Sequence, residues 1–316
     1  MTTLLVSSVG GHLTQLHRLL PRLEAIDAER RWVTFDSPQS RSLLAEEDAI
    51  FLDYAGPRDA KMLLRHSLVA RRLFRGGHRY STVISTGSGI ALSFLPLARV
   101  CGASCHFIES FTRSDGPSLT GRILGRVPGI SLYAQYHSWA RGRWKYAGSV
   151  FDAFVPLADP RPSAEVRRVV VTLGTMEDYG FRRLLERLLA ILPSGSEVLW
   201  QVGCTDVSGL ALEAHRQLPA ATLRRAMEDA DVVVAHAGCG SSVSALEAGK
   251  TPVLVPRSAA HGENVDDHQR LLATELAERG LAVVSDVETL SLADLQVAAR
   301  SRVSAEASVV PFRLEC

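Results

Sequence analysis

The sequence predicts an α/β protein with two Rossmann-like domains, each built on a parallel sheet. Short apolar strands alternate with amphipathic helices in both halves, glycine turns follow several of these strands, and a proline-rich segment separates the halves. A chain of 316 residues with 46% apolar residues is long enough to form two cores. We therefore expect domains at 1–155 and 166–316, joined by a linker at 156–165.

The first half predicts the opening of a βαβ unit. Short apolar runs indicate strands at 4–8, 31–35, 49–52, 82–85 and 105–108. Gly10 and Gly11 follow the first strand and precede a helix over about 14–24, whose leucines share one face. An apolar helix is expected after Gly89, ending near Val100.

The second half repeats this order after the linker. Strands are expected at 169–173, 197–202, 231–235 and 252–255, and helices at 181–192 and 291–301. Three prolines stand between residues 156 and 162, and proline is disfavoured in the interior of helices and central strands. We therefore interpret this segment as a linker.

Charge is divided unequally between the halves. The formal net charge is +1, but residues 1–150 carry a net +8 and residues 151–316 a net −7. Such asymmetry indicates that the basic half meets an anionic partner, either a membrane surface or a nucleic acid. Nucleic acid is disfavoured because aromatic residues make up only 6% of the chain and no recognition motif is present.

Cysteine usage and hydropathy exclude several classes. The five cysteines are odd in number and form no Cys-x-x-Cys pair, so neither a disulfide framework nor a zinc knuckle is supported. The N-terminus has no basic signal region, and the longest apolar run, 90–98, is far shorter than the ~20 residues that cross a bilayer. We expect a cytoplasmic protein without a membrane span of its own.

The most specific motif follows the strand at 231–235. His236 ends this strand, Gly238 and Gly240 allow close backbone approach, and a helix is expected from about Ser241. Free N–H groups at a helix start favour an anion such as a diphosphate, and Ser241 or Ser242 can cap the helix or bind phosphate. The alternative is an ordinary glycine turn with a serine cap.

This stretch resembles the donor-nucleotide signature of MurG-like GT-B glycosyltransferases, and it is closer still to the PssE-like short subunit of a two-protein N-acetylglucosaminyltransferase. MurG places a ribose-binding Glu where this chain has Ser244, so Glu247 either binds the ribose or braces the helix. The resemblance implies donor-binding roles for Gly174, Thr175, His236, Gly238, Gly240, Ser241, Ser242, Glu247, His268 and Gln269.

The first half resembles the PssD-like long subunit at 8–15, 85–89, 108–113 and 116–121, so the chain looks like a natural fusion of the two subunits. It is expected to have the GT-B arrangement, with the two sheets facing a central cleft. The acceptor-binding residues implied by this resemblance are Gly10, Gly11, Gly87, Ser88, Gly89 and Arg113.

The resemblance implies an inverting transfer from a UDP-sugar to a polyprenyl-diphosphate-linked saccharide in exopolysaccharide or cell-surface glycan synthesis. The transferred group is a hexosyl, N-acetylhexosaminyl or uronosyl group. Such a reaction needs a base for the acceptor hydroxyl and a stabiliser for the departing UDP. His12 and Glu109 are the candidate bases, but His12 could instead be a helix-start hydrogen bonder and Glu109 could pair with Arg113.

No cofactor or metal is expected. The segment 261–269 contains several metal-ligand types, but we interpret it as a polar loop whose His268 and Gln269 meet the donor sugar. The pair Asp229 and Asp231 resembles a manganese motif of another glycosyltransferase fold, but it precedes a buried strand. Both metal interpretations are therefore disfavoured.

A basic helical segment over 58–75 supports two interpretations. Leu64, Leu68, Val69 and Leu73 share one face, which in an ordinary surface helix packs against the sheet. In a helix on an anionic leaflet, basic side chains contact lipid headgroups. The membrane-facing residues are then Lys61, Arg65, Arg71, Arg72 and Arg75, at the inner face of the plasma membrane.

Three rival functions remain open at this level. The chain could glycosylate a soluble natural product, or it could be a nucleotide-sugar 2-epimerase, which shares this architecture. The non-enzymatic alternative is a nucleotide-sugar sensor. The sequence leaves the identity of the donor sugar open.

Overall fold

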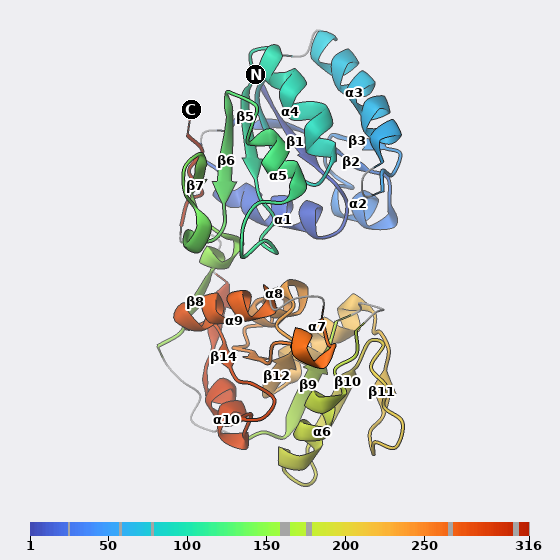
Figure 1. Ribbon diagram of the computed structural model, residues 1–316, viewed down its shortest axis with the longest axis vertical. Helices are drawn as coiled ribbons and strands as arrows, with labels where there is room; N and C mark the ends of the chain where they lie inside the picture. Colours follow the sequence, from blue (N-terminus) through green and yellow to red (C-terminus); the bar gives the residue numbers. More distant parts are fainter. Residues whose placement is uncertain are drawn as a thin grey trace. The chain divides into compact units, whose positions relative to one another are not determined.

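The computed structural model describes residues 1–24, 26–56, 59–76, 79–158, 165–174, 179–264, 268–305 and 310–315, with the His268 side chain outside this description. The chain forms two compact units, Met1–Asp152 with Ala307–Cys316, and Ala153–Glu306 (Figure 1). Each unit is described by itself below.

The first unit is built on a seven-stranded parallel sheet with the order β3-β2-β1-β4-β5-β6-β7. In the central register, Leu4 of β1 lies opposite Arg31 of β2 on one side and Val83 of β4 on the other. The strands are β1 (Thr2–Ser7), β2 (Glu29–Phe35), β3 (Ala49–Leu52), β4 (Tyr80–Gly87), β5 (Ser104–Ile108), β6 (Ile130–Ala134) and β7 (Trp144–Tyr146).

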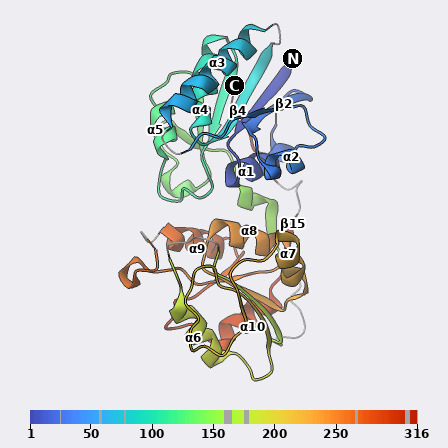
Figure 2. The same ribbon diagram turned by 90° about the vertical axis from the view of Figure 1, so that its right-hand side faces the viewer.

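Helices cover both faces of this sheet (Figures 1 and 2). On one face, Ala70 of α3, Phe94 of α4 and Leu124 of α5 join one hydrophobic cluster with the sheet, while α1 covers the opposite face. The helical segments are α1 (Gly11–Leu19), η1 (Leu20–Arg22), α2 (Pro38–Leu43), α3 (Ala60–Arg75), α4 (Ile90–Val100), α5 (Leu119–Leu124), η2 (His137–Trp139) and η3 (Val150–Ala153). Within the described residues, no helix of either unit has the length and apolar character needed to cross a membrane.

The second unit carries a six-stranded parallel sheet with the order β11-β10-β9-β12-β13-β14, and β8 pairs antiparallel with β15 in a small separate sheet. Helices α6 and α10 pack on one face, and α7 and α8 on the other. The strands are β8 (Phe154–Pro156), β9 (Arg168–Thr172), β10 (Glu197–Gln201), β11 (Ala214–His215), β12 (Val232–Ala235), β13 (Val253–Leu254), β14 (Val283–Val284) and β15 (Val303–Ala305). The helices are α6 (Arg182–Ile191), α7 (Ala220–Asp229), α8 (Cys239–Glu247), η4 (Ala259–His261), α9 (His268–Glu278) and α10 (Leu292–Arg300).

The α/β prediction with parallel sheets is confirmed, and most predicted strands agree with the structure within two residues. The first helix is earlier than expected. It begins at Gly11 and gives way to a 3₁₀ turn at Leu20, because Pro21 removes the N–H that would continue the α-helix. Strands β6 and β7 of the first sheet, the edge strands β11 and β14 of the second sheet, and the β8–β15 pair were not predicted.

Two boundaries differ from the expected domains. Pro156, placed in the linker, ends β8 and pairs with Val303, which an edge strand permits. The C-terminal segment, placed in the second domain, packs in the first unit. There the Phe312 ring is fully buried against Tyr133 and the Arg22 guanidinium bonds the Val310 carbonyl at 2.7 Å. Residues 159–164 of the expected linker lie outside the described residues.

The burial of Phe312 can be tested by truncation. Phe312→Ala should destabilise the first unit by about 3–5 kcal/mol, because a fully buried aromatic ring leaves a cavity. Calorimetric unfolding should show the loss, while Val310→Ala, at a side chain 41% exposed, should change stability by less than about 0.5 kcal/mol. Equal stability of Phe312→Ala and wild type would contradict the packing described.

Candidate functional site

Each sheet has one position where the strand order reverses. The crossovers run in opposite directions from β1 and β4 in the first unit, and from β9 and β12 in the second. In open α/β sheets, ligands bind outside the carboxyl ends of the strands at such a position. The loops that follow these four strands therefore define one candidate site in each unit.

The first unit has a cavity of about 640 Å³ at this position. His12, from α1, lines it together with the loop after β4 and the segment after β5. Leu63 of α3 and Leu119 and Ile123 of α5 form part of its apolar wall. Among the predicted residues, those that line the cavity are His12, Gly87, Ser88, Gly89, Glu109 and Arg113.

Gly10 and Gly11 do not line this cavity. Gly10 adopts a left-handed φ of 75° at the start of α1, and its N–H donates to the Gln39 side chain at 2.9 Å. Gly11 is the first residue of α1. Their visible role is to turn the chain from β1 into the helix that carries His12.

The His12 imidazole is held by β4. Its Nδ1 lies 2.7 Å from the Thr86 carbonyl oxygen, and the Thr86 hydroxyl donates to the His12 carbonyl at 2.8 Å. Because a carbonyl only accepts, Nδ1 carries the proton and Nε2 has a free lone pair. Burial lowers the pKa of His12 below 6.5, against the opposing effect of the Thr86 hydrogen bond, so the ring is neutral at neutral pH.

Glu109 is buried, and both of its carboxylate oxygens accept hydrogen bonds. Its Oε1 accepts the Ser110 N–H at 2.9 Å, and its Oε2 accepts the Ser118 N–H at 2.8 Å and the Ser118 hydroxyl at 2.9 Å. Burial raises the pKa of Glu109, although these hydrogen bonds oppose the shift. The alternative ion pair with Arg113 is not formed, since Arg113 lies 3.4 Å from Asp115 instead. Glu109 thus holds the loop between β5 and α5.

Two buried glutamines brace this loop and were not found in the sequence analysis. Gln15 Nε2 donates to the Glu109 carbonyl at 3.0 Å, and its Oε1 accepts the Phe111 N–H at 3.1 Å. Gln135 Nε2 also donates to the Glu109 carbonyl, at 2.8 Å. For Gln15, the sequence signal was a polar residue on the apolar face of the first helix; Gln135 follows β6, which was not predicted.

His236 lies at the corresponding position of the second unit. Its Nδ1 is 3.2 Å from the Thr172 carbonyl oxygen, at the end of β9. Glycine is required on both sides of the ring. A Cβ at Gly174 would lie 2.8 Å from His236 Cε1, and one at Gly238 would lie 2.2 Å from Nε2. The two glycines predicted to contact a ligand therefore also make room for the imidazole.

Burial, helped by the Arg257 charge, lowers the pKa of His236 from 6.5 to about 3. The folded protein therefore keeps this ring neutral while the unfolded chain protonates it below pH 6.5. The contribution of His236 to stability is complete above pH 6.5 and is lost as the pH falls towards 3.

Helix α8 begins next to His236, with Gly238 at its N-cap. Among the described residues no side chain caps this helix, and Gly240 has open space where a side chain would be, so the first turn leaves room for a ligand. Ser241 makes no hydrogen bond through its hydroxyl within the described part of the chain, but Ser242 is buried and donates to the Gly238 carbonyl at 3.0 Å. Ser241 is thus available to a ligand and Ser242 is structural.

The remaining predicted donor residues lie further from this turn or outside the description. Glu247 is exposed at the last residue of α8, about 9 Å along the helix axis from Ser241. Gln269 is buried, and its Oε1 accepts the Arg257 N–H at 3.0 Å. Thr175 and the His268 side chain lie outside the described residues.

Arg257 is the residue of this region to which the sequence analysis gave no role. It follows the buried end of β13, is 1% exposed, and donates through Nη2 to the Leu173 carbonyl at 2.8 Å. Burial lowers the pKa of Arg257. A charged residue directly after an apolar strand was the available signal.

Glu263 belongs to the segment considered above as a possible metal site, but it forms an ion pair with Arg183. Both of its oxygens accept from Arg183, at 2.8 and 2.9 Å, and Oε2 also accepts the Ser258 N–H. Within the described residues, no group of three or more His, Cys, Asp or Glu side chains is arranged to hold a metal ion.

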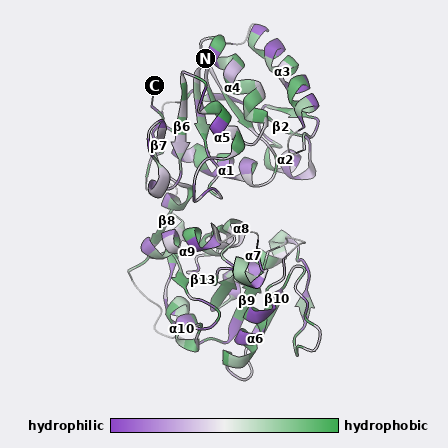
Figure 3. Cartoon of the chain, viewed as in Figure 1, coloured by the Kyte–Doolittle hydropathy of each residue, from purple (hydrophilic) through white to green (hydrophobic). Residues whose placement is uncertain are grey.

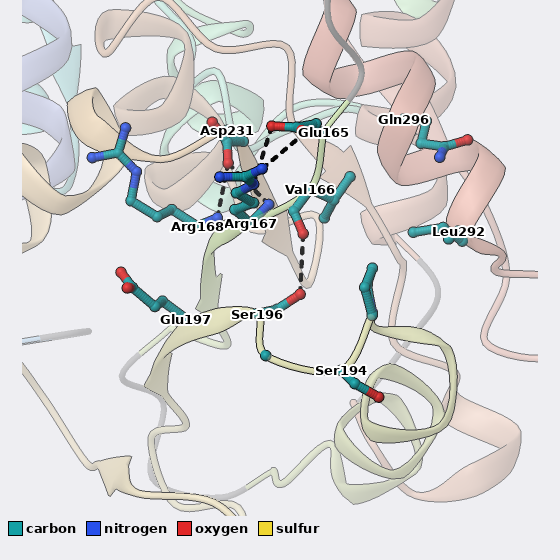
Figure 4. A pocket seen from close by; sticks show the side chains of 12 residues that line it. Glu165, Val166, Arg167, Arg168, Ser194, Ser196, Glu197, Asp231, Leu292 and Gln296 are labelled. Atoms are coloured by element: carbon teal, nitrogen blue, oxygen red, sulfur yellow. Dashed lines mark hydrogen bonds and ion pairs between the residues drawn. The ribbon is translucent and has the colours of Figure 1, made fainter.

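A second cavity, of about 1040 Å³, lies at the amino ends of the strands of the second sheet (Figure 4). Asp231 faces it and accepts the N–H groups of Arg167 and Arg168, at 3.0 and 2.8 Å. This carboxylate therefore joins the starts of β9 and β12, at the end of β12 away from His236. Asp231 therefore has a structural role at this end of the sheet, and Asp229 is the last residue of α7.

Alanine substitutions at the two glycines of the α8 start, Gly238 and Gly240, should have different effects on stability. Gly238→Ala should destabilise the ligand-free second unit by about 1–3 kcal/mol, because the added methyl group meets His236. Gly240→Ala is the matched control and should leave stability unchanged or raise it, since its Cβ meets nothing within 4 Å and alanine favours the helix. Thermal unfolding measures both, and equal effects would refute the steric role of Gly238.

Comparison with known proteins agrees with this geometry. Residues 169–303 match the model of the Glycosyltransferase family 28 C-terminal domain. The matched range contains nearly all of β9 and the whole of β12 and α8, together with Arg257. A protein of Synechococcus sp. (strain CC9902), the UDP-N-acetylglucosamine--N-acetylmuramyl-(pentapeptide) pyrophosphoryl-undecaprenol N-acetylglucosamine transferase, is 28% identical over 90% of this chain and 83% of its own length. The protein of the same name from Synechococcus sp. (strain RCC307) is 27% identical over 88% of this chain and 80% of its own.

Solved structures establish the fold. MurG from Acinetobacter baumannii superposes with a TM-score of 0.58 at 17% identity, covering 94% of this chain and 89% of its own. The glycosyltransferase SnogD from Streptomyces nogalater gives 0.51 at 19% identity, covering 95% and 92%. The finer resemblance to a PssD–PssE fusion stays a prediction. The chain is a glycosyltransferase with the GT-B fold; residues 169–303 match the family 28 C-terminal domain, and the chain is similar to MurG-like glycosyltransferases over most of its length.

Proposed function

We propose that this enzyme transfers a hexosyl, N-acetylhexosaminyl or uronosyl group from a UDP-sugar to a polyprenyl-diphosphate-linked saccharide, with inversion at the anomeric carbon. One observation carries the proposal: the family 28 domain has an open helix N-terminus beside His236 at the position where the order of its strands reverses. The names of the relatives supply the chemical class, an undecaprenyl-diphosphate-linked acceptor and a UDP-linked donor sugar.

His12 is the proposed general base. Its Nδ1 proton is committed to Thr86, so Nε2 can accept the proton of an acceptor hydroxyl in the cavity of the first unit. Glu109 is less suited, because both of its oxygens already accept hydrogen bonds from Ser110 and Ser118. We assign Glu109 the role of positioning the loop that it holds.

On the donor side, the first turn of α8 offers the diphosphate the positive end of the helix dipole and the N–H groups of Gly240 and Ser241, which donate to no acceptor among the described residues. The Ser241 hydroxyl lies in the same turn. These groups stabilise negative charge on the leaving UDP, and we propose that no metal or other cofactor is required. Glu247 stays a candidate for the ribose.

We further propose that α3 contacts the inner face of the plasma membrane. Leu64 and Leu68 are 66% and 51% exposed, so only part of the apolar stripe packs against the sheet. Hydrophobic and hydrophilic residues alternate along α3 (Figure 3). The exposed basic side chains beside these leucines are Lys61, Arg65, Arg71, Arg72 and Arg75. Together they suit an anionic leaflet, whereas nucleic acid is not proposed.

A UDP-release assay tests the reaction. The enzyme is incubated with a panel of UDP-sugars, with and without bacterial lipid extract, and both UDP and glycolipid are measured. Release that requires the lipid extract supports the proposal. Release with a soluble acceptor alone would identify a natural-product transferase, and epimerised UDP-sugar without acceptor would identify a 2-epimerase.

His12→Ala should lower kcat by about 10²- to 10⁴-fold while UDP still binds, because a general base contributes this much. The wild-type kcat/KM should fall on the acid side with a midpoint below pH 6.5, since His12 must be neutral to act and burial lowers its pKa. Wild-type turnover by His12→Ala, or an acid midpoint above pH 6.5, would refute His12 as the base.

The membrane contact is tested by vesicle co-sedimentation. Arg71→Glu/Arg72→Glu should lose binding to vesicles containing anionic lipid, since each basic side chain near the surface contributes about 1 kcal/mol. Arg224→Glu/Arg225→Glu, an adjacent exposed pair on α7 of the second unit, is the matched control and should bind as wild type does. Equal loss in both variants would indicate a general charge effect.

A further inference from the structure

We propose that Arg257 is a diphosphate-binding residue of the donor site, where its guanidinium neutralises the charge that remains on the departing nucleoside diphosphate. This inference rests on the proposed function. It assigns to one buried side chain the positive charge that a sugar-diphosphate transferase needs at its leaving group.

The guanidinium is buried with most of its hydrogen-bonding capacity unused. Arg257 is 1% exposed, and its Nη2 donates to the Leu173 carbonyl. Its Nε and Nη1 are buried and have no hydrogen-bond partner in the described structure. A buried polar group without a partner is costly, and a buried charge is costlier still. Its retention is explained if a ligand supplies the missing partner.

No carboxylate in the described structure forms an ion pair with Arg257. Cys204 and Glu263 are close enough to favour the charged form of Arg257, but the Glu263 oxygens bind Arg183 and the Ser258 N–H. The Arg257 guanidinium also lies over the Phe181 ring, 5.9 Å from the ring centroid. Within the described part of this unit, the positive charge is therefore left without a paired negative one.

The position of the guanidinium points to the donor site. Leu173, which it contacts, directly precedes Gly174, and Gly174 lies against the His236 ring beside the start of α8. The Arg257 charge also disfavours protonation of His236. The unpaired guanidinium, the neutral imidazole and the open helix start thus occupy the same carboxyl-end region of β9 and β12. An anion bound there satisfies both the helix and the arginine.

The proposed sugar transfer creates negative charge that the Arg257 guanidinium can stabilise. As the acceptor oxygen bonds to the anomeric carbon, the bond from that carbon to the phosphate oxygen breaks and its electron pair stays on the diphosphate. The acceptor proton passes to the base. Additional negative charge therefore develops on the leaving group, and a fixed guanidinium in a dry site stabilises it more than water does.

Nucleotide affinity is the direct test. Arg257→Met removes the charge but keeps a long apolar stem. Calorimetry should show that UDP and inorganic pyrophosphate bind it roughly 10- to 100-fold more weakly than wild type, the loss expected for hydrogen bonds to a charged group. The affinity for uridine, which has no phosphate, should be unchanged. Arg257→Lys keeps the charge and should lose less UDP affinity than Arg257→Met.

Arg187→Met is the matched control. Arg187 lies on α6 of the same unit, and its Nε also donates to a backbone carbonyl, that of Leu290, at 2.8 Å. This variant should bind UDP as wild type does. Ligand-free Arg257→Met should unfold at a temperature no lower than wild type, because replacing an unpaired buried charge by an apolar side chain is neutral or stabilising.

Equal UDP affinity of Arg257→Met and wild type would overturn the inference. A parallel loss of UDP and uridine affinity, with a lower unfolding temperature, would also overturn it and show that Arg257 only braces Leu173. These outcomes are separate from the proposed function. A wild-type enzyme that binds UDP but transfers no sugar refutes the transferase proposal, whereas the affinity comparison still decides the role of Arg257.

Discussion

One hydrogen bond is repeated in the two units, and the chemistry of both sites depends on it. In each unit the strand order reverses between two neighbouring strands, and a histidine that follows one of them donates its Nδ1–H to a backbone carbonyl of the other. His12 donates to Thr86, and His236 donates to Thr172. The carbonyl determines which nitrogen carries the proton, so both rings present the Nε2 lone pair. Burial lowers both pKa values, which keeps the rings neutral.

This contact also explains the glycines. Gly87 follows Thr86 with a left-handed backbone, and its Cα lies beside the His12 ring. Gly174 follows Thr172 by two residues in the same conformation, beside His236. A side chain at either position would meet strained backbone geometry, and at Gly174 it would also overlap the imidazole. The glycines that suggest ligand contact therefore first of all make the histidine contact possible.

The two units differ in how many hydrogen bonds their buried charged side chains make to the protein. In the first, the Glu109 carboxylate accepts three hydrogen bonds from the protein and holds a loop, so its charge serves the fold. In the second, two buried nitrogens of the Arg257 guanidinium have no hydrogen-bond partner among the described residues. Because a buried group without a partner is costly, the first arrangement indicates structure and the second indicates a ligand. Arg257 also gives a local positive charge to a half of the chain whose net charge is −7.

The sequence by itself determined the two α/β units, most of their strands, and the motif from His236 to Gln269, because hydrophobic periodicity and glycine spacing are local properties. It could not choose between His12 and Glu109, since both follow a strand and both titrate. Only the tertiary structure showed that Ser110 and Ser118 occupy the Glu109 oxygens while His12 keeps a free Nε2. For the same reason the sequence did not predict that Phe312 packs in the first unit, or that Nε and Nη1 of Arg257 lack partners among the described residues. Hydrogen-bond satisfaction and burial depend on partners distant in the chain, and these are brought together only when the sheets form.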